Sequence, residues 1–254
     1  MRPDLKAVVL AAGKGTRLQV GDGDVPKAMR EVCGKPLLWY VLDSLSFIEK
    51  ENVIIVVGYK KDEIINRFKD YTFADQTEQL GTGHAVMSAS AELSGFSGAV
   101  LVCYGDMPAI RRATYEALVK AHYTYNYDCT ILTGESSIPL PYGRIVRGAN
   151  GDFMHVVEDR DCTREQLAIK ELNSGVYVFR TPPLLDALKS ITRDNSQGEY
   201  YLTDVPKIMK DGGGAVGTLN LNLGDEIIGV NTQEQLEQVE GIMRIRNSEF
   251  GIRN

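Results

Sequence analysis

Histidine and cysteine are scarce in this sequence. There are three histidines in 254 residues, and none belongs to a recognisable Ser-His-Asp arrangement for nucleophilic catalysis. The four cysteines stand far apart and form no CxxC pair, so the sequence predicts neither a zinc site nor a disulfide framework. Such cysteine usage is typical of a reducing compartment, and we expect a cytoplasmic protein.

The sequence also lacks long apolar runs and an excess of positive charge. No stretch approaches the roughly 18 apolar residues that a membrane span needs. The net charge is −6, which argues against a general nucleic-acid-binding protein. The N-terminal residues show no convincing signal-peptide cleavage site. We therefore expect neither a membrane nor a nucleic acid as a partner.

What the sequence does contain is a series of short apolar runs separated by helix-like segments. Residues 7–12, 53–57 and 99–103 are continuous apolar runs, which is typical of strands buried on both faces of a parallel sheet. Residues 37–48 place apolar side chains at helical spacing, and residues 83–93 are rich in small helix formers. This order predicts an α/β protein with an open, mostly parallel sheet and helices on both faces.

The second half carries shorter strand-like segments that are broken by glycine and proline. We expect them to extend the same sheet and to add a small β-rich layer. The expected strands are residues 129–133, 144–147, 153–157 and 175–179, and the expected helices are residues 203–210 and a final helix from residue 232 onward.

The first apolar run passes directly into the loop "AAGKGTRL", residues 11–18. Glycines after a strand leave backbone N–H groups free to face an anion, and Lys14 and Arg17 add positive charge. The alternative is a tight turn between a strand and a helix, with two solvated cations. A Walker loop needs glycine at position 18 and a dinucleotide fingerprint needs glycine or alanine there, whereas the sequence has Leu18. The loop therefore belongs to neither class.

The loop is instead similar to the signature of sugar-1-phosphate nucleotidyltransferases, and further motifs of that family follow in order over nearly the entire chain. Within the family, the sequence most resembles the uridylyltransferase half of the bifunctional bacterial enzymes that make UDP-N-acetylglucosamine. The motifs are "LAAGKGTRL" (10–18), "VPKAM" (25–29), "GKPLL" (34–38), "QLGTGHAV" (79–86), "YGDMP" (104–108), "YGRIVR" (142–147), "VVEDRD" (156–161), "ELNSGVYVF" (171–179), "GEYYLTDV" (198–205) and "GVNT" (229–232).

The resemblance implies the nucleotide-diphospho-sugar transferase fold, a Rossmann-like sheet with an additional sugar-binding lobe. It divides the chain into a nucleotidyltransferase domain, residues 1–231, and a C-terminal helix, residues 232–254. Within that domain, residues 1–106 form the nucleotide-binding half and residues 107–231 the sugar-binding half. The β-helix of the acetyltransferase half has a hexapeptide period that does not occur here. Because that half carries most of the trimer contacts in the bifunctional enzymes, we expect a monomer or a weak homo-oligomer.

The activity that the resemblance implies is transfer of uridylyl from UTP to N-acetylglucosamine 1-phosphate, with release of pyrophosphate. The nucleophile is a phosphate oxygen with a second pKa near ~6, so it is largely anionic at neutral pH and needs no general base. Catalysis must overcome repulsion between two anions. Two alternatives stay open. One is the same chemistry on another sugar 1-phosphate, such as glucose 1-phosphate with UTP or dTTP, and the other is a catalytically silent nucleotide-sugar-binding regulatory subunit.

By the same resemblance, Arg17 and Lys27 are the expected catalytic residues. Arg17 would surround the β and γ phosphates together with Gly15 and Thr16. Lys27 would neutralise charge on the α-phosphate and on the incoming sugar phosphate. A regulatory subunit usually loses such charged residues, and their presence favours an enzyme.

Asp106 and Asn231 are similar to the Mg²⁺ pair of the family. Hard oxygen ligands, completed by phosphates and waters, are what this ion requires. Taken alone, Asp106 is equally compatible with a turn, and Asn231 with the N-cap of the final helix. The resemblance favours the metal role for both residues.

The remaining expected contacts also follow from the resemblance. A glutamine amide can pair with a uracil edge, and a glycine lets the backbone approach the base closely. A glutamate and an asparagine can bind sugar hydroxyls or the acetamido group. The expected nucleotide contacts are Leu10, Ala11, Ala12, Gly13, Gly15, Thr16, Gln79, Gly81, Thr82, Tyr104 and Gly105, and the expected sugar contacts are Gly143, Glu158 and Asn173.

Overall fold

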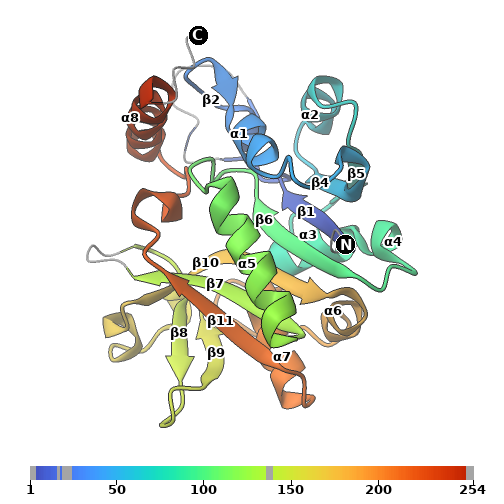
Figure 1. The fold of residues 1–254 in the computed structure, drawn as a ribbon, viewed down its shortest axis with the longest axis vertical. Helices are drawn as coiled ribbons and strands as arrows, with labels where there is room; N and C mark the ends of the chain where they lie inside the picture. Colours follow the sequence, from blue (N-terminus) through green and yellow to red (C-terminus); the bar gives the residue numbers. More distant parts are fainter. Residues whose placement is uncertain (1–3, 16–17, 19–24, 136–139, 250–254) are drawn as a thin grey trace.

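The computed structural model describes residues 4–15, 18, 25–135 and 140–249. Within this part of the chain, one nine-stranded sheet crosses the molecule (Figure 1). Its main path runs, in spatial order, through β11 (Val216–Leu221), β7 (Cys129–Glu135), β10 (Glu171–Arg180), β6 (Ala99–Tyr104), β1 (Leu5–Leu10), β4 (Val53–Val57) and β5 (Thr72–Asp75).

Most neighbouring strands of this path are parallel. β1 pairs in parallel with both β4 and β6, β4 with β5, and β7 with β11. Only β10 runs antiparallel to its neighbours β6 and β7 among the described strands of the path. The expected open, mostly parallel sheet is therefore confirmed. The chain builds outward from β1 in one direction and then, through β6, in the other, which makes the β1–β6 boundary the switch point where such sheets bind ligands.

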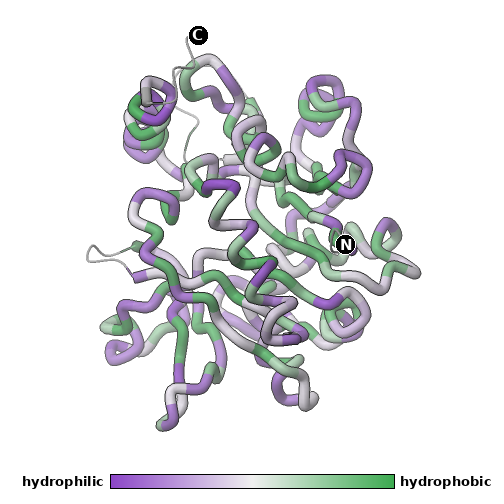
Figure 2. Tube along the Cα trace, viewed as in Figure 1, coloured by the Kyte–Doolittle hydropathy of each residue, from purple (hydrophilic) through white to green (hydrophobic). Residues whose placement is uncertain are grey.

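Both faces of the sheet are buried, because alternate side chains of each central strand enter different cores. In β1, Ala7 and Val9 belong to one core, whereas Val8 and Leu10 belong to the other. This arrangement explains why the central strands read as continuous apolar runs. In Figure 2 the hydrophobic colouring follows the central strands, and hydrophilic residues gather on the outer helices.

Helices cover the two faces in separate layers. The first core is closed by α1 (Leu37–Ser44), α2 (Lys61–Arg67) and α5 (Arg112–Tyr125). The second is closed by α3 (Thr82–Ser88), α4 (Ser90–Leu93), α6 (Thr181–Leu188) and α7 (Val205–Asp211). The strands β8 (Arg144–Arg147) and β9 (Phe153–Val157) form a hairpin that branches from β10. This hairpin supplies the expected β-rich addition to the sheet.

Most expected elements are confirmed, and the differences have local causes. The expected helix at 83–93 begins at Thr82 and is divided into α3 and α4 at Ala89. The strand expected at 175–179 is the longer β10, which contains a register shift between Asn173 and Tyr177. The edge strands β5 and β11 were not expected, because an edge strand is partly solvated and lacks a continuous apolar run.

The final helix, α8 (Gln233–Glu249), packs against β2 (Glu31–Val32), which pairs with β3 (Lys35–Pro36). Its apolar residues Val239 and Met243 join a third small core. The helix begins with a capping box. Thr232 Oγ1 accepts a hydrogen bond from the backbone N–H of Gln235, and Gln235 Oε1 accepts one from the backbone N–H of Thr232. Across the described ranges, none of the helices has the length and apolar character needed to cross a membrane.

Candidate active site

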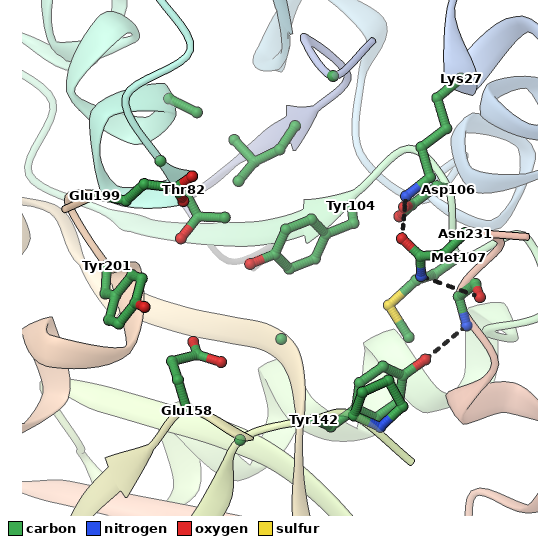
Figure 3. Close-up of a pocket in the computed structure, with 18 of the residues that line it drawn as sticks. Lys27, Thr82, Tyr104, Asp106, Met107, Tyr142, Glu158, Glu199, Tyr201 and Asn231 are labelled. Carbon is green, nitrogen blue, oxygen red and sulfur yellow. Dashed lines mark hydrogen bonds and ion pairs between the residues drawn. The ribbon is translucent and has the colours of Figure 1, made fainter. Parts of the chain in front are cut away.

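A cleft of about 590 Å³ opens at the carboxyl ends of β1 and β6 (Figure 3). It lies at the switch point of the sheet, and its other walls include part of β10, the segments that flank the β8–β9 hairpin and the segment before α8. The expected site residues that line it are Leu10, Ala11, Ala12, Gly13, Lys27, Gln79, Gly81, Thr82, Tyr104, Asp106, Gly143, Glu158, Asn173 and Asn231. Residues from eight separate motifs thus meet in one cavity.

The end of β1 presents its backbone along one wall of the cleft. The Ala11 amide donates to the Val56 carbonyl oxygen at 2.9 Å, and the Ala12 carbonyl accepts from the Tyr59 amide at 3.2 Å. These bonds hold the turn against β4. A Cβ atom on Gly13 would meet no atom within 4 Å, so this glycine borders open space. Such a wall leaves room for a phosphate chain beside the turn.

Two of the expected contacts, Gly15 and Gly105, are not among the residues that line the cleft. Gly15 has φ +66°, and a Cβ atom there would lie 2.8 Å from Lys27 Cβ. Glycine is therefore required at this position, because the loop packs directly on the lysine. The Gly105 amide donates to the Leu10 carbonyl oxygen at 2.9 Å, which joins β6 to β1. Thr16 and Arg17 lie outside the described residues.

The three charged or polar groups expected to act on phosphate and metal converge on one point. Lys27 Nζ forms an ion pair with Asp106 Oδ2 and donates a 2.7 Å hydrogen bond to Asn231 Oδ1. The side chains of Lys27 and Asp106 are only 16% and 17% exposed, so solvent screens this contact weakly. Figure 3 shows the three side chains pointing toward one another at one end of the cleft.

Asp106 and Asn231 offer oxygen atoms that suit a divalent cation. The two residues are tied by their backbones, because the Val230 amide donates to the Asp106 carbonyl oxygen at 2.9 Å. Within the described ranges no group of three or more His, Cys, Asp and Glu side chains could hold a metal by itself. Two hard oxygens that depend on phosphates and waters for the remaining positions are the donor set that Mg²⁺ commonly uses. The residues therefore fit the ion.

The alternative role of Asn231 as an N-cap is wrong. Thr232 caps α8, and the Asn231 side chain accepts from Lys27 and donates to the Gly229 carbonyl oxygen at 3.4 Å. Gln235 Oε1 also accepts a 2.7 Å hydrogen bond from the backbone N–H of Asn231. The start of α8 therefore positions Asn231 without using its side chain.

The wall expected to bind the base is held by two hydrogen bonds among Gln76, Gln79 and Gly81. Gln79 Nε2 donates to the Gln76 carbonyl oxygen at 3.2 Å, and Gln76 Nε2 donates to the Gly81 carbonyl oxygen at 3.1 Å. Gln76 is 4% exposed, whereas Gln79 is exposed. Gln76 therefore supports the loop that presents Gln79 to the cleft, a role that the sequence analysis missed.

The wall expected to bind the sugar includes the carboxylate of Glu158. Glu158 Oε1 accepts a 2.9 Å hydrogen bond from Thr203 Oγ1. Burial is the main cause that raises the pKa of Glu158, and the bond from Thr203 lowers it in part. Figure 3 shows the Glu158 carboxylate pointing into the cleft opposite Tyr104.

Asn173 has a structural role as well as a place on the wall. Its Nδ2 donates to Tyr177 Oη at 2.7 Å, and its Oδ1 accepts from the Gly175 amide at 3.1 Å. Its backbone amide also donates to the Gly143 carbonyl oxygen at 2.9 Å. The side chain thus stabilises the irregular register of β10, where it faces the cleft.

Several lining residues were not expected from the sequence. Most of them belong to the quoted motifs, so position in a motif was the available signal; these include Met107, Tyr142, Asp159, Arg160, Ser174 and Glu199. The others lie outside the motifs, and their place in the cavity depends on the tertiary structure; they include Gln76, Pro141, Gln197 and Gln235.

Comparison with known proteins supports the resemblance found in the sequence. A protein named Bifunctional protein GlmU from Clostridium novyi is 42% identical over 250 residues, which cover 98% of this chain and 54% of that protein. Its counterpart from an Exiguobacterium species is 43% identical over 244 residues, with 96% and 53% covered. The chain thus spans about half the length of the curated relatives it matches.

The crystal structure of HddC from Yersinia pseudotuberculosis, complexed with GMP-PN, is similar in fold. It superposes with a TM-score of 0.66 at 22% identity, covering 94% of this chain and 99% of that one. The family model described as MobA-like NTP transferase domain matches residues 7–200. The chain therefore belongs to the MobA-like NTP transferase family, and it is a nucleotidyltransferase.

Proposed function

We propose that the protein transfers uridylyl from UTP to N-acetylglucosamine 1-phosphate and releases pyrophosphate. The observation that carries this proposal is the convergence of Lys27, Asp106 and Asn231 at one end of a cleft. The same cleft places Gln79 on one wall and Glu158 on another. These positions match the motifs for phosphate, uracil and amino sugar that the sequence shares with the family.

In the proposed reaction, an oxygen of the sugar phosphate attacks the α-phosphorus of UTP, and the bond to the β-phosphate oxygen breaks. The nucleophile is already ionised near neutral pH, so the protein must position two anions and reduce their repulsion. We assign this task to Lys27, whose ammonium group reaches the cleft from a largely buried position. Arg17, Gly15 and Thr16 are assigned to the β and γ phosphates.

The nucleoside is assigned to the wall that the end of β1 shares with the Gln79 loop. The backbone from Leu10 to Gly13 would follow the uridine and the first phosphate. Gln79 would pair with the uracil edge, and Gly81, with φ +109°, would bring the backbone close to the base. Thr82, Tyr104 and Gly105 complete the nucleotide contacts that we propose.

We assign Mg²⁺ to Asp106 and Asn231, which would hold it while it neutralises charge on the triphosphate. The sugar is assigned to Gly143, Glu158 and Asn173. The side-chain amide of Asn173 already forms hydrogen bonds with two other residues of β10. Glu158 is therefore the stronger candidate for recognition of the sugar. We further propose the division into a nucleotidyltransferase domain, 1–231, and a C-terminal helix.

A panel assay of pyrophosphate release tests this proposal. Four nucleoside triphosphates and several sugar 1-phosphates are compared, with UTP and N-acetylglucosamine 1-phosphate expected to react fastest. Asp106→Ala and Asn231→Ala should each lower turnover by at least about 100-fold, because they remove electrostatic support for the transferred phosphate. Faster turnover of glucose 1-phosphate would contradict the substrate assignment.

A matched control is available in an exposed ion pair. Lys50 Nζ lies 2.9 Å from Asp70 Oδ2, and both side chains are more than half exposed. Asp70→Ala removes the same charge as Asp106→Ala but lies outside the cleft, so turnover should stay unchanged. Equal activities of the Asp70 and Asp106 variants would refute the metal assignment.

A further inference from the structure

The hydroxyl group of Tyr142 joins two parts of the cleft that are far apart in sequence. Tyr142 Oη donates a 2.8 Å hydrogen bond to the Ile227 carbonyl oxygen and accepts a 2.8 Å hydrogen bond from the Gly229 amide. Both partners lie in the segment that leads to Asn231. In Figure 3 Tyr142 lies below Met107 and Asn231, with its hydroxyl directed at this segment. One hydroxyl group therefore satisfies two backbone groups of one loop.

The Tyr142 hydroxyl is suited to form these two hydrogen bonds permanently. Burial raises the pKa of Tyr142 to about 12, although the bond from Gly229 lowers it in part. The hydroxyl therefore keeps its proton at neutral pH and remains a donor. A Cβ atom on Gly229 would lie 3.2 Å from Tyr142 Oη. The absence of a side chain at this position permits the close approach of the loop.

Beyond Gly229, the loop connects directly to both residues assigned to the cation. The Val230 amide donates to the Asp106 carbonyl oxygen at 2.9 Å, and Asn231 Nδ2 donates to the Gly229 carbonyl oxygen at 3.4 Å. The segment from Ile227 to Asn231 is thus held by Tyr142 on one side and by the end of β6 on the other. The hydrogen bonds to Tyr142 and to Asp106 together fix the backbone that carries Asn231.

Tyr142 is also continuous with the sugar side of the cleft. The carbonyl oxygen of the next residue, Gly143, accepts a 2.9 Å hydrogen bond from the backbone N–H of Asn173. The Tyr142 carbonyl oxygen accepts from the Arg144 guanidinium, which pairs with Asp159 at 3.0 Å. Movement of this wall would therefore reach the Asn231 loop through Tyr142.

We propose that Tyr142 is a positioning residue that holds Asn231 opposite Asp106 and so couples the cation site to the sugar wall. This inference rests on the proposed function, because Asp106 and Asn231 receive the cation there. Tyr142 acts through the backbone of the loop and needs no contact with the reacting atoms. Loss of its hydroxyl leaves the Ile227 carbonyl and the Gly229 amide without their shared partner, which frees the loop.

The variant Tyr142→Phe tests the inference, with Mn²⁺ as a probe. Binding of Mn²⁺ to the full chain in the presence of UTP is followed by electron paramagnetic resonance. We expect the dissociation constant of Mn²⁺ to rise about tenfold, the size expected for loss of one net hydrogen bond. Amide exchange of residues 227–231 should accelerate in the same variant without any ligand, which gives a readout independent of the cation.

Tyr123→Phe is the matched control. Tyr123 Oη donates a 2.9 Å hydrogen bond to the Asp4 carbonyl oxygen. Tyr123 lies in α5 and does not line the cleft. This variant should bind Mn²⁺ as the unchanged chain does. Equal weakening in both variants would show a general loss of stability and would overturn the positioning role.

A double-mutant comparison separates the positioning role from the metal assignment. In an Asn231→Ala background, Tyr142→Phe should weaken Mn²⁺ binding no further, because the ligand that it positions is gone. Unchanged Mn²⁺ affinity in Tyr142→Phe, together with weak binding by Asp106→Ala, would refute the inference and leave the proposed function standing. Equal Mn²⁺ binding by Asp106→Ala and the unchanged chain would refute the cation site, and the role of Tyr142 with it.

Discussion

Lys27 Nζ donates a 2.7 Å hydrogen bond to Asn231 Oδ1, a residue 204 positions later in the chain. The same ammonium group pairs with Asp106, so a positive charge lies between the two oxygens that we assign to a divalent cation. A divalent ion and the ammonium group therefore compete for these oxygens. Binding of the ion would release Lys27 toward the phosphates.

The variant Lys27→Met should separate metal binding from catalysis. Turnover should fall by about 100-fold or more, because a preorganised positive charge is lost from the reacting centre. The affinity of the nucleotide-free protein for Mn²⁺ should rise, since no ammonium group competes at Asp106 and Asn231. Isothermal titration with Mn²⁺ and a pyrophosphate assay measure the two effects. Weaker Mn²⁺ binding in Lys27→Met would contradict the competition.

Replacement of Glu158 by glutamine should raise stability and lower affinity for the sugar phosphate. Burial raises the pKa of Glu158, so the folded protein binds the proton more tightly than the unfolded chain. Its contribution to stability is therefore lost as pH rises above the ordinary carboxyl pKa. In Glu158→Gln, the gain in unfolding free energy should be larger at pH 7.5 than at pH 5 in urea titrations.

The same variant should raise KM for N-acetylglucosamine 1-phosphate by roughly tenfold, because a hydrogen bond to a charged acceptor is lost. KM for UTP should change little, since Glu158 lies on the wall of the cleft that we assign to the sugar. A variant with unchanged KM for both substrates would show that Glu158 does not bind the sugar.

The variant Gly81→Ala should disturb the base wall more than an ordinary loop substitution. Gly81 has φ +109°, and a Cβ atom there would lie 2.6 Å from the Tyr200 carbonyl oxygen. We expect a loss of roughly 1–3 kcal/mol in unfolding free energy from strain and overlap, with weaker UTP binding. Chemical denaturation and nucleotide titration measure these effects.

Gly213→Ala is the control for backbone strain alone. Gly213 has φ +85°, and a Cβ atom there would meet no atom within 4 Å. It should lose stability through its backbone conformation and keep the affinity for UTP. Equal UTP affinities in the two variants would show that the Gly81 loop does not contact the base.

His122 should make stability fall in mild acid. Burial is the main cause that lowers its pKa to about 4, and Arg180 lowers it further. The unfolded chain therefore takes up the proton first, so stability is complete above about pH 6.5 and declines as pH falls toward 4. The slope from this one group is at most about 1.4 kcal/mol per pH unit. In His122→Gln, denaturation from pH 7 to 4.5 should show a shallower decline; an unchanged slope would assign the acid sensitivity to other groups.

The candidate site was predictable where short motifs carry the chemistry. The glycine loop, Lys27, Asp106 and Asn231 were all named from their motifs, and Gly13, Lys27, Asp106 and Asn231 line a single cleft. The supporting contacts were not predictable. Gln76 acts through a backbone group five positions along the chain, and Tyr142 acts through backbone groups 85 and 87 positions away. Such partners leave no local pattern in the sequence, because any residue supplies the backbone atoms that they contact.

The amino-acid sequence by itself determined the class of fold, since buried parallel strands need continuous apolar runs and their helices need apolar faces. It also determined which charged residues and glycines are available to a phosphate chain. Only the tertiary structure decided that Lys27 lies between Asp106 and Asn231, and that Thr232 rather than Asn231 caps α8. The physical reason is that these contacts depend on crossovers of the sheet, which bring segments from opposite ends of the chain to the ends of β1 and β6.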